Sequence, residues 1–148
     1  MRLRCASALA LLLSLASALR ADGPGPPDTP QGRRMKALIS AFESGTPEAI
    51  RAFVSGNFAA AALKEAPVEQ RVQRLSGMAQ ETGPLEFHSA LRGEGSEISF
   101  LARSKKSGGW IEIVLRLEPG PPFGILGLRF DESQGPGAPR QSKKGSDA

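Results

Sequence analysis

The sequence has no tyrosine, and it has only one histidine (His88), one tryptophan (Trp110) and one cysteine (Cys5). A single cysteine excludes an intramolecular disulfide, so the folded part must be stabilised by packing. A single histidine excludes a multi-histidine metal site, and any histidine-based catalytic site would have to be built around His88. The sequence also lacks a Gly-x-Ser-x-Gly elbow and a phosphate-binding glycine loop. We therefore predict no metal site, no cofactor and no dedicated catalytic motif.

The excess of basic residues is small. The formal net charge is +4, and three of the arginines lie within the first 21 residues, so their removal would leave +1. No stretch combines a dense basic run with interleaved aromatic residues, which is the pattern expected of a nucleic-acid-binding surface. Nucleic acid is therefore not an expected partner.

The N-terminus has the pattern of a secretory signal peptide. Two arginines precede an apolar run over residues 6–19, which contains an Ala-Ser-Ala triplet near its end. The run is shorter than the roughly 20 residues needed to span a bilayer, so we expect no stable membrane anchor. Cleavage after residue 21 would also remove Cys5. We therefore expect a secreted or periplasmic protein.

The rest of the chain divides by composition into three parts. Residues 22–32 are rich in proline and glycine, which predicts a flexible linker. Residues 132–148 lack large apolar side chains, which predicts a disordered C-terminal tail. Residues 33–131 remain as one domain of about 100 residues, which is enough for a single modest core.

Apolar residues recur at helical spacing in three segments before residue 84. The three stripes are Met35, Leu38, Ile39 and Phe42; Ile50, Phe53 and Val54; and Val68, Val72, Leu75 and Met78 or Ala79. Gly45, Thr46 and Pro47 form a corner between the first two helices, because Gly can end a helix and Thr-Pro can begin the next. The third helix is expected to start at Pro67. Residues 57–62 are read either as a further helical turn or as an irregular crossing segment.

After Pro84 the period of the apolar residues changes to two, which predicts four strands over residues 85–92, 97–104, 110–118 and 123–131. Strict alternation places Phe87, Ser89 and Leu91 on the inner face with Leu85. In the last strand it places Leu128 and its alternate neighbours inside and Ile125 outside. The expected fold is α+β, with three N-terminal helices packed on one face of a four-stranded antiparallel sheet.

Three stretches carry a family resemblance: AFESGTPEAIRAFVSGNF, RVQRLSGMAQETGPLEF and GWIEIVLRLEPGPPFGILGLRF. They resemble the NTF2-like, or SnoaL-like, α+β cone superfamily, and in particular the exported bacterial NTF2-like domains that occur beside serine hydrolases or proteases. The shared features are a helix pair with a glycine corner, a proline-led third helix that ends near a glycine, and a closing strand after a proline-rich loop. The resemblance covers about residues 35 to 131.

The resemblance implies a curved sheet wrapped around the helices, as in an NTF2-like or cystatin-like cone, whose interior serves some relatives as a ligand pocket or active site. Enzymatic relatives hold an Asp, His or Tyr acid-base set in the cone. This chain departs from that pattern, since it has no tyrosine and one histidine. The resemblance also implies pairing of two copies through their sheets, and so a homodimer.

Large apolar residues dominate the expected interior, and small alanines at residues 59–62 and 79 leave room for a small apolar ligand. The candidate ligand-binding residues are Phe42, Phe53, Phe58, Met78, Phe87, Ile113 and Leu128. The alternative is that these side chains fill the interior themselves.

The outer face of the expected sheet is polar and carries the single tryptophan. The candidate partner-binding residues are Trp110, Leu101, Arg103, Glu112 and Arg116. Trp is enriched at interface hot spots, so this face is a candidate surface for a protein partner or a second copy of the chain. The alternative is that Trp110 covers the edge of the core and that the charged residues are solvated.

Taken together, these features favour a secreted, non-catalytic binding or accessory module that engages a protein partner or a small apolar ligand. The alternative is a small isomerase- or cyclase-type enzyme that uses His88 with Glu86, two residues away on the same strand face. General acid-base chemistry would need the two groups close together in a shielded site.

Overall fold

The computed structural model describes residues 25–91 and 95–137. The expected signal peptide and most of the expected C-terminal tail lie outside these ranges. In the described part, four helices precede four strands: α1 (Pro30–Ser44), α2 (Pro47–Asn57), α3 (Ala60–Glu65), α4 (Val68–Thr82), β1 (Leu85–Leu91), β2 (Glu97–Ser104), β3 (Trp110–Leu117) and β4 (Ile125–Ser133). The strands form one antiparallel sheet in the order β1-β2-β3-β4. The α+β prediction is confirmed, with four helices where three were expected.

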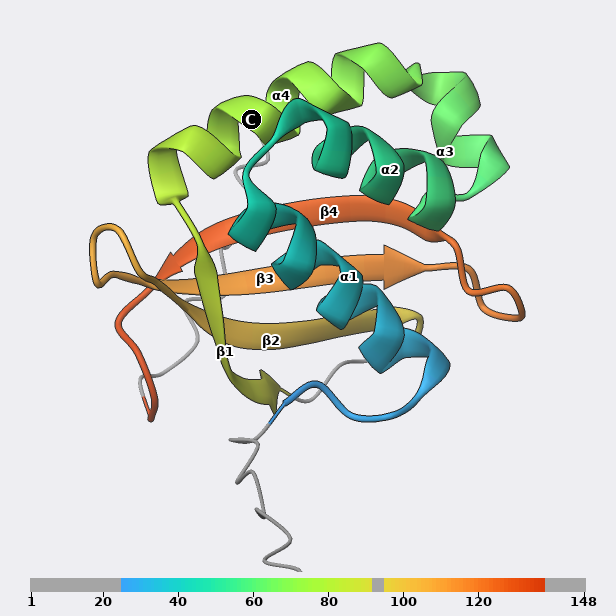
Figure 1. The fold of residues 1–148 in the computed structure, drawn as a ribbon. Helices are drawn as coiled ribbons and strands as arrows, with labels where there is room; N and C mark the ends of the chain where they lie inside the picture. Colours follow the sequence, from blue (N-terminus) through green and yellow to red (C-terminus); the bar gives the residue numbers. More distant parts are fainter. Residues whose placement is uncertain (1–24, 92–94, 138–148) are drawn as a thin grey trace, which may run out of the picture.

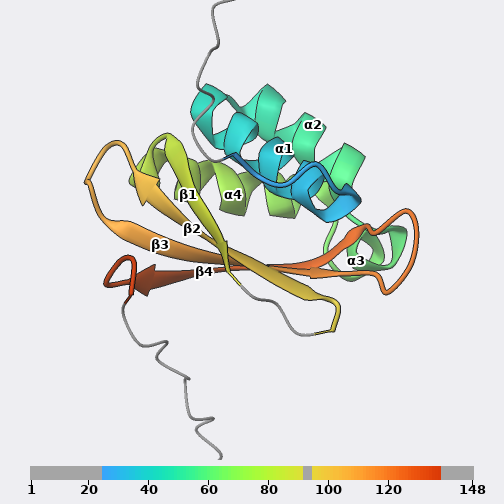
Figure 2. The ribbon, with the colours of Figure 1, turned by 90° about the horizontal axis from the view of Figure 1, so that it is seen from below.

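The molecule has two layers. Figure 1 shows the helices on one side of the sheet, with α1 crossing in front of the strands and α4 running above β4. Figure 2, seen from below, shows α1, α2 and α4 on the same face of the twisted sheet and α3 beside one end of β4. One face of the sheet is therefore covered by helices and the other is not.

The corner between α1 and α2 forms as its residue types predict. Gly45 ends α1 with φ of 65° and donates its backbone N–H to the carbonyl of Ala41. Thr46 then caps α2 by accepting from the backbone N–H of Ala49 at 3.2 Å. At the other end of α1, Thr29 caps the helix, so regular structure begins at Pro30, inside the range expected to be a linker.

The helix that was not predicted with certainty, α3, is short and alanine-rich, and no side chain caps its start. It is held instead by backbone contacts with β4. Phe58 forms an isolated parallel bridge with Ile125, and the N–H of Ala59 donates to the carbonyl of Ile125 at 2.9 Å. The close approach needs glycine at position 124, where a Cβ would lie 2.9 Å from the Cα of Ala59.

The β2–β3 turn closes the C-terminal end of α4. Ser104 donates its hydroxyl to the carbonyl of Thr82, and the ammonium of Lys106 donates to the carbonyl of Gln80 at 2.7 Å. These bonds satisfy carbonyls that have no partner within the helix. Gly83 turns the chain with φ of 71° and ψ of −167°, and a Cβ there would meet the Cβ of Lys106 at 2.7 Å.

Two irregularities in the sheet change which side chains face the helices. In β1 the register shifts between Phe87 and Ser89, so His88 is an extra residue. Ser89 then lies opposite Leu101, and Leu91 lies opposite Ser99. The prediction that Ser89 and Leu91 share the inner face with Phe87 was therefore wrong, because a bulge inverts the alternation beyond it.

The second irregularity lies at the start of β4. Leu117 pairs with Ile125 while Arg116 pairs with Gly127, so Leu126 is the extra residue. Ile125 consequently belongs to the core and is 0% exposed. The prediction that Ile125 lies outside was wrong for the same physical reason, whereas Leu128 and Phe130 pack on the core as expected.

The core lies between the helices and the inner face of the sheet. All three helical stripes contribute to it, with Leu38, Ile50 and Val54 each 0% exposed. The central strands add Phe100, Ile113 and Leu115. Outside the core, Arg51 of α2 and Glu69 of α4 form an exposed ion pair, which raises the pKa of Arg51 through its hydrogen bond to Glu69.

Candidate ligand-binding pocket

Most of the interior is filled by the protein's own side chains. Of the residues predicted to bind a ligand, Phe42, Phe53 and Ile113 are 1%, 4% and 0% exposed. The ring of Phe42 stacks on that of Phe130, with centroids 5.4 Å apart. Phe87 packs against Phe100, with centroids 5.9 Å apart. None of these four predicted residues, Phe42, Phe53, Phe87 and Ile113, lines either of the two pockets described below.

A pocket of about 110 Å³ remains between α4 and β4. Its apolar lining consists of Phe58, Leu75, Met78, Leu128 and Phe130. Phe58, Met78 and Leu128 were predicted as ligand-binding residues, so the structure brings three of the seven predicted residues together here. The remaining lining residues are Arg71 and Arg74, which were not predicted.

The walls follow from the local sequence. Arg71, Arg74, Leu75 and Met78 occupy positions i, i+3, i+4 and i+7 of α4, so they share one side of the helix. Leu128 and Phe130 alternate on the inner face of β4, opposite Leu115 and Ile113. The side of α4 that carries these four residues therefore faces β4, which is an edge strand of the sheet.

Arg71 is held in place from three sides. Its Nη2 donates to the carbonyl of Ala62 at 2.7 Å, and its Nε donates to the carbonyl of Ala66 at 3.0 Å. Its guanidinium lies over the ring of Phe58, 4.7 Å from the centroid. The carbonyl of Ala66 follows the end of α3, the carbonyl of Ala62 also accepts from the N–H of Ala66, and the third contact is a cation–π contact. Arg71 therefore acts as a fixed part of the pocket wall.

Arg74 is different. It is exposed and has no hydrogen-bond or ion-pair partner among residues 25–91 and 95–137. Since Arg stays protonated at any ordinary pH, the mouth of the pocket carries an unneutralised positive charge. The sequence signal for this feature is two arginines three residues apart beside the apolar stripe of α4.

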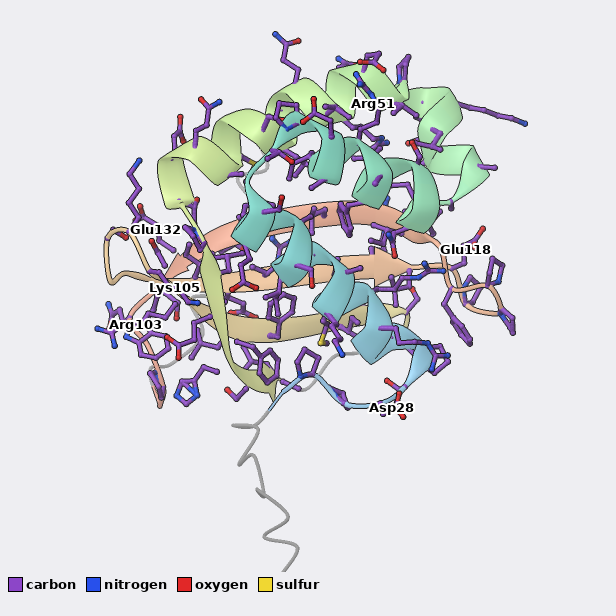
Figure 3. All side chains as sticks on the ribbon, in the orientation of Figure 1. Asp28, Arg51, Arg103, Lys105, Glu118 and Glu132 are labelled. Carbon is purple, nitrogen blue, oxygen red and sulfur yellow. The ribbon has the colours of Figure 1, made fainter. Side chains whose placement is uncertain are left out.

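A second hollow, of about 320 Å³, lies between the start of α1 and the ends of β2 and β3. Its apolar lining consists of Ile98, Leu117, Pro119 and Phe123, and its polar side chains include Gln31 and Glu118. The carboxylate of Glu118 is already used, because it accepts from the backbone N–H of Gly124 at 2.9 Å. Figure 3 places Glu118 at the end of the sheet away from Lys105.

The loop beside this hollow is tied down by one arginine. Arg34 of α1 donates to the carbonyls of Pro122 and Phe123 at 2.8 and 3.2 Å, and to the side chain of Asn57 at 2.9 Å. It therefore joins α1, the end of α2 and the β3–β4 loop. These hydrogen bonds give Arg34 a structural role.

The outer face of the sheet holds all five residues predicted to bind a partner. Arg103 pairs with Trp110 across β2 and β3, and Leu101 pairs with Glu112. Leu101 is only 3% exposed, so it offers little apolar surface. Arg103 and Arg116 are exposed, and Arg103 lies at the same end of the sheet as Lys105 (Figure 3).

The indole of Trp110 is enclosed by neighbours. The ring of His88 lies against it with centroids 5.0 Å apart, and the guanidinium of Arg103 lies 5.6 Å from the ring centroid. The backbone of Gly135 packs so closely that a Cβ there would lie 2.8 Å from the indole nitrogen. The indole is consequently half-buried rather than free-standing.

The candidate acid-base pair lies on the outer face of the sheet, away from the pocket. His88 is the bulged residue of β1, and Glu86 lies opposite Arg103. Neither residue lines the pocket between α4 and β4. Within residues 25–91 and 95–137 there is also no group of three or more His, Cys, Asp or Glu side chains arranged to hold a metal ion.

None of the helices in the described part of the chain is both long enough and apolar enough to cross a bilayer. Comparison of the chain with protein-family models, with curated proteins and with solved structures gives no match. The NTF2-like resemblance therefore remains a hypothesis drawn from the residues themselves.

Proposed function

We propose that this protein is an exported, non-catalytic binding module of the NTF2-like kind, which holds a small apolar ligand in the pocket between α4 and β4. The observation that carries the proposal is the contrast within the interior. Core residues such as Phe42 and Ile113 are almost completely buried, while Met78 and Leu128 are partly exposed and line an open pocket together with the edge of Phe58. Small-molecule sites combine apolar side chains with a few polar groups in a concavity, and this pocket has both kinds of lining at a smaller size.

The size of the pocket limits the ligand. At about 110 Å³ it is smaller than a cavity of about 150 Å³ that binds benzene. The fit is to the end of an alkyl chain or the edge of a ring, with the rest of the ligand outside. Each methylene group that enters contributes about 0.8 kcal/mol.

The lining supports binding over turnover. Apart from its apolar residues it offers two guanidinium groups, and neither is a general base at ordinary pH. The enzyme alternative uses His88 and Glu86, which do not line this pocket. His88 instead packs against Trp110 on the outer sheet face.

A second candidate function is recognition of a protein partner, or of a second copy of the chain, through the outer sheet face. The exposed guanidinium groups of Arg103 and Arg116 favour it, because Arg is enriched at interfaces. The enclosure of Trp110 and the burial of Leu101 weaken it, since the apolar part of the face is already covered.

Calorimetric titration with 1-octanol, a neutral alkyl probe, tests the proposal. We expect saturable binding that Leu128→Trp abolishes by filling the pocket. The matched control is Leu126→Trp on the same strand, because Leu126 does not line the pocket. Binding that survives Leu128→Trp, or that both variants remove equally, would exclude this pocket as the site.

A further inference from the structure

The charge at the pocket mouth is unbalanced. The lining residues contain two cationic side chains and no carboxylate. Arg71 donates hydrogen bonds from two of its nitrogen atoms to the carbonyls of Ala62 and Ala66. Arg74 donates no hydrogen bond to any described residue. One guanidinium fork is therefore available beside an apolar space.

A guanidinium next to an apolar wall matches a ligand with one charged end and one apolar end. Arg binds carboxylates with two parallel hydrogen bonds, and its planar group is weakly hydrated, so it pairs with anions at partly covered sites. Lys64 and Arg33 are also exposed, but neither lines the pocket. Arg74 thus differs from Lys64 and Arg33, because it lines a pocket that also contains apolar side chains.

We propose that the ligand is an amphipathic carboxylate, with its alkyl or aromatic end against Phe58, Met78 and Leu128 and its carboxylate paired with Arg74. This inference rests on the proposed function, because it names the ligand class for the same pocket. Arg71 keeps its positive charge, but two of its donors are already used by backbone carbonyls, so Arg74 is the guanidinium with all its donors free. One guanidinium pairs the two oxygens of a carboxylate with two parallel hydrogen bonds, whereas a phosphate monoester presents three acceptor oxygens.

The geometry also assigns separate roles to the two arginines. Arg71 shapes the pocket, since its guanidinium is packed on Phe58 and bonded to the end of α3. Arg74 selects the ligand, since it contributes charge without holding the fold. Replacing Arg74 should alter which ligand binds and leave the folded structure unchanged.

The test compares octanoate, 1-octanol and octyl phosphate by calorimetric titration of the full mature chain. Octanoate should bind about fivefold more tightly than octanol, the factor expected of one partly exposed ion pair. Arg74→Gln should remove that preference, so that octanoate and octanol bind with similar affinity. The control Arg33→Gln, which changes an exposed arginine outside the pocket, should keep the preference.

The possible results distinguish a wrong ligand class from a wrong binding site. Equal binding of octanoate and octanol, lost together in Leu128→Trp, would leave the pocket function standing and overturn the carboxylate assignment. Tighter binding of octyl phosphate than of octanoate would overturn the assignment in favour of a phosphate. A preference for octanoate that persists in Arg74→Gln would overturn the role of Arg74. Failure of all three ligands to bind would overturn the proposed function and the inference with it.

Discussion

The guanidinium of Arg71 lies over the ring of Phe58, 4.7 Å from its centroid, and joins α4 to the segment that leads into α3. The same group donates to the carbonyls of Ala62 and Ala66, so one side chain connects two helices and an aromatic ring. Arg74, one turn further along α4, makes no such contacts with described residues. Two arginines three residues apart therefore have different consequences for stability.

Arg71→Ala should lower the free energy of unfolding by about 2 kcal/mol, because hydrogen bonds from a charged donor to two backbone carbonyls are lost. Arg74→Ala should change it by no more than about 0.5 kcal/mol, as expected of an exposed side chain without partners. Urea denaturation followed by circular dichroism measures both. Equal losses in the two variants would refute the separation of roles.

Gly83 and Gly77 give a matched pair at one helix. Gly83→Ala should destabilise the protein by about 2 kcal/mol or more, because φ of 71° is unfavourable for alanine and the new Cβ would meet Lys106. Gly77→Ala should stabilise it by about 0.5–1 kcal/mol, because Gly77 lies inside α4 with no heavy atom within 4 Å of a built Cβ. Thermal unfolding of the two variants should shift in opposite directions. A lower unfolding temperature for Gly77→Ala would contradict the finding that a Cβ at position 77 meets no neighbouring atom.

The bulge at Leu126 can be tested by truncation of two adjacent residues. Ile125→Ala should cost about 2–5 kcal/mol, because Ile125 is 0% exposed in the core. Leu126→Ala should cost about 1 kcal/mol at most, since Leu126 lies outside the core cluster. Strict alternation predicts the reverse order. Chemical denaturation midpoints for the two variants decide between the registers.

Arg34 ties α1 to the β3–β4 loop, and its neighbour supplies the control. Arg34→Ala should lower the free energy of unfolding by about 2 kcal/mol, because donors to Pro122, Phe123 and Asn57 are lost together. Arg33→Ala removes only an ion pair with Asp28 whose side chains are 65% and 99% exposed, so its effect should be about 0.5 kcal/mol or less. Amide hydrogen exchange should also rise around residues 119–124 in the Arg34 variant alone. Unchanged exchange there would show that the loop is held by other contacts.

Much of the architecture was predictable because it depends on local chemistry. The stripe of Ile50, Phe53 and Val54 and the Gly45-Thr46 corner require only helical spacing and capping. The second strand was predicted with the bounds that β2 has, because β-branched and aromatic residues are bounded there by turn residues. These features do not depend on distant parts of the chain.

The features that were missed or left open depend on contacts between distant residues. The helix α3 has six residues and no side-chain cap, and its position depends on the contact of Ala59 with Ile125. The bulges at His88 and Leu126 arise where one strand adjusts to its neighbour. No residue type in β1 signals its bulge, whereas Gly127 beside Leu126 is a weak signal in β4. In the sequence, Arg71 and Arg74 resemble ordinary surface residues, and their place in the pocket depends on the packing of α4 beside β4.

The most direct test of the central claim is a methyl NMR titration of the protein with octanoate. The account predicts saturable shifts at the methyl groups of Leu75, Met78 and Leu128, with little change at Leu101 or Val114 on the outer sheet face. Shifts that concentrate at Leu101 and Val114, or an absence of saturable shifts at the pocket methyl groups, would contradict the claim that the pocket between α4 and β4 is the binding site.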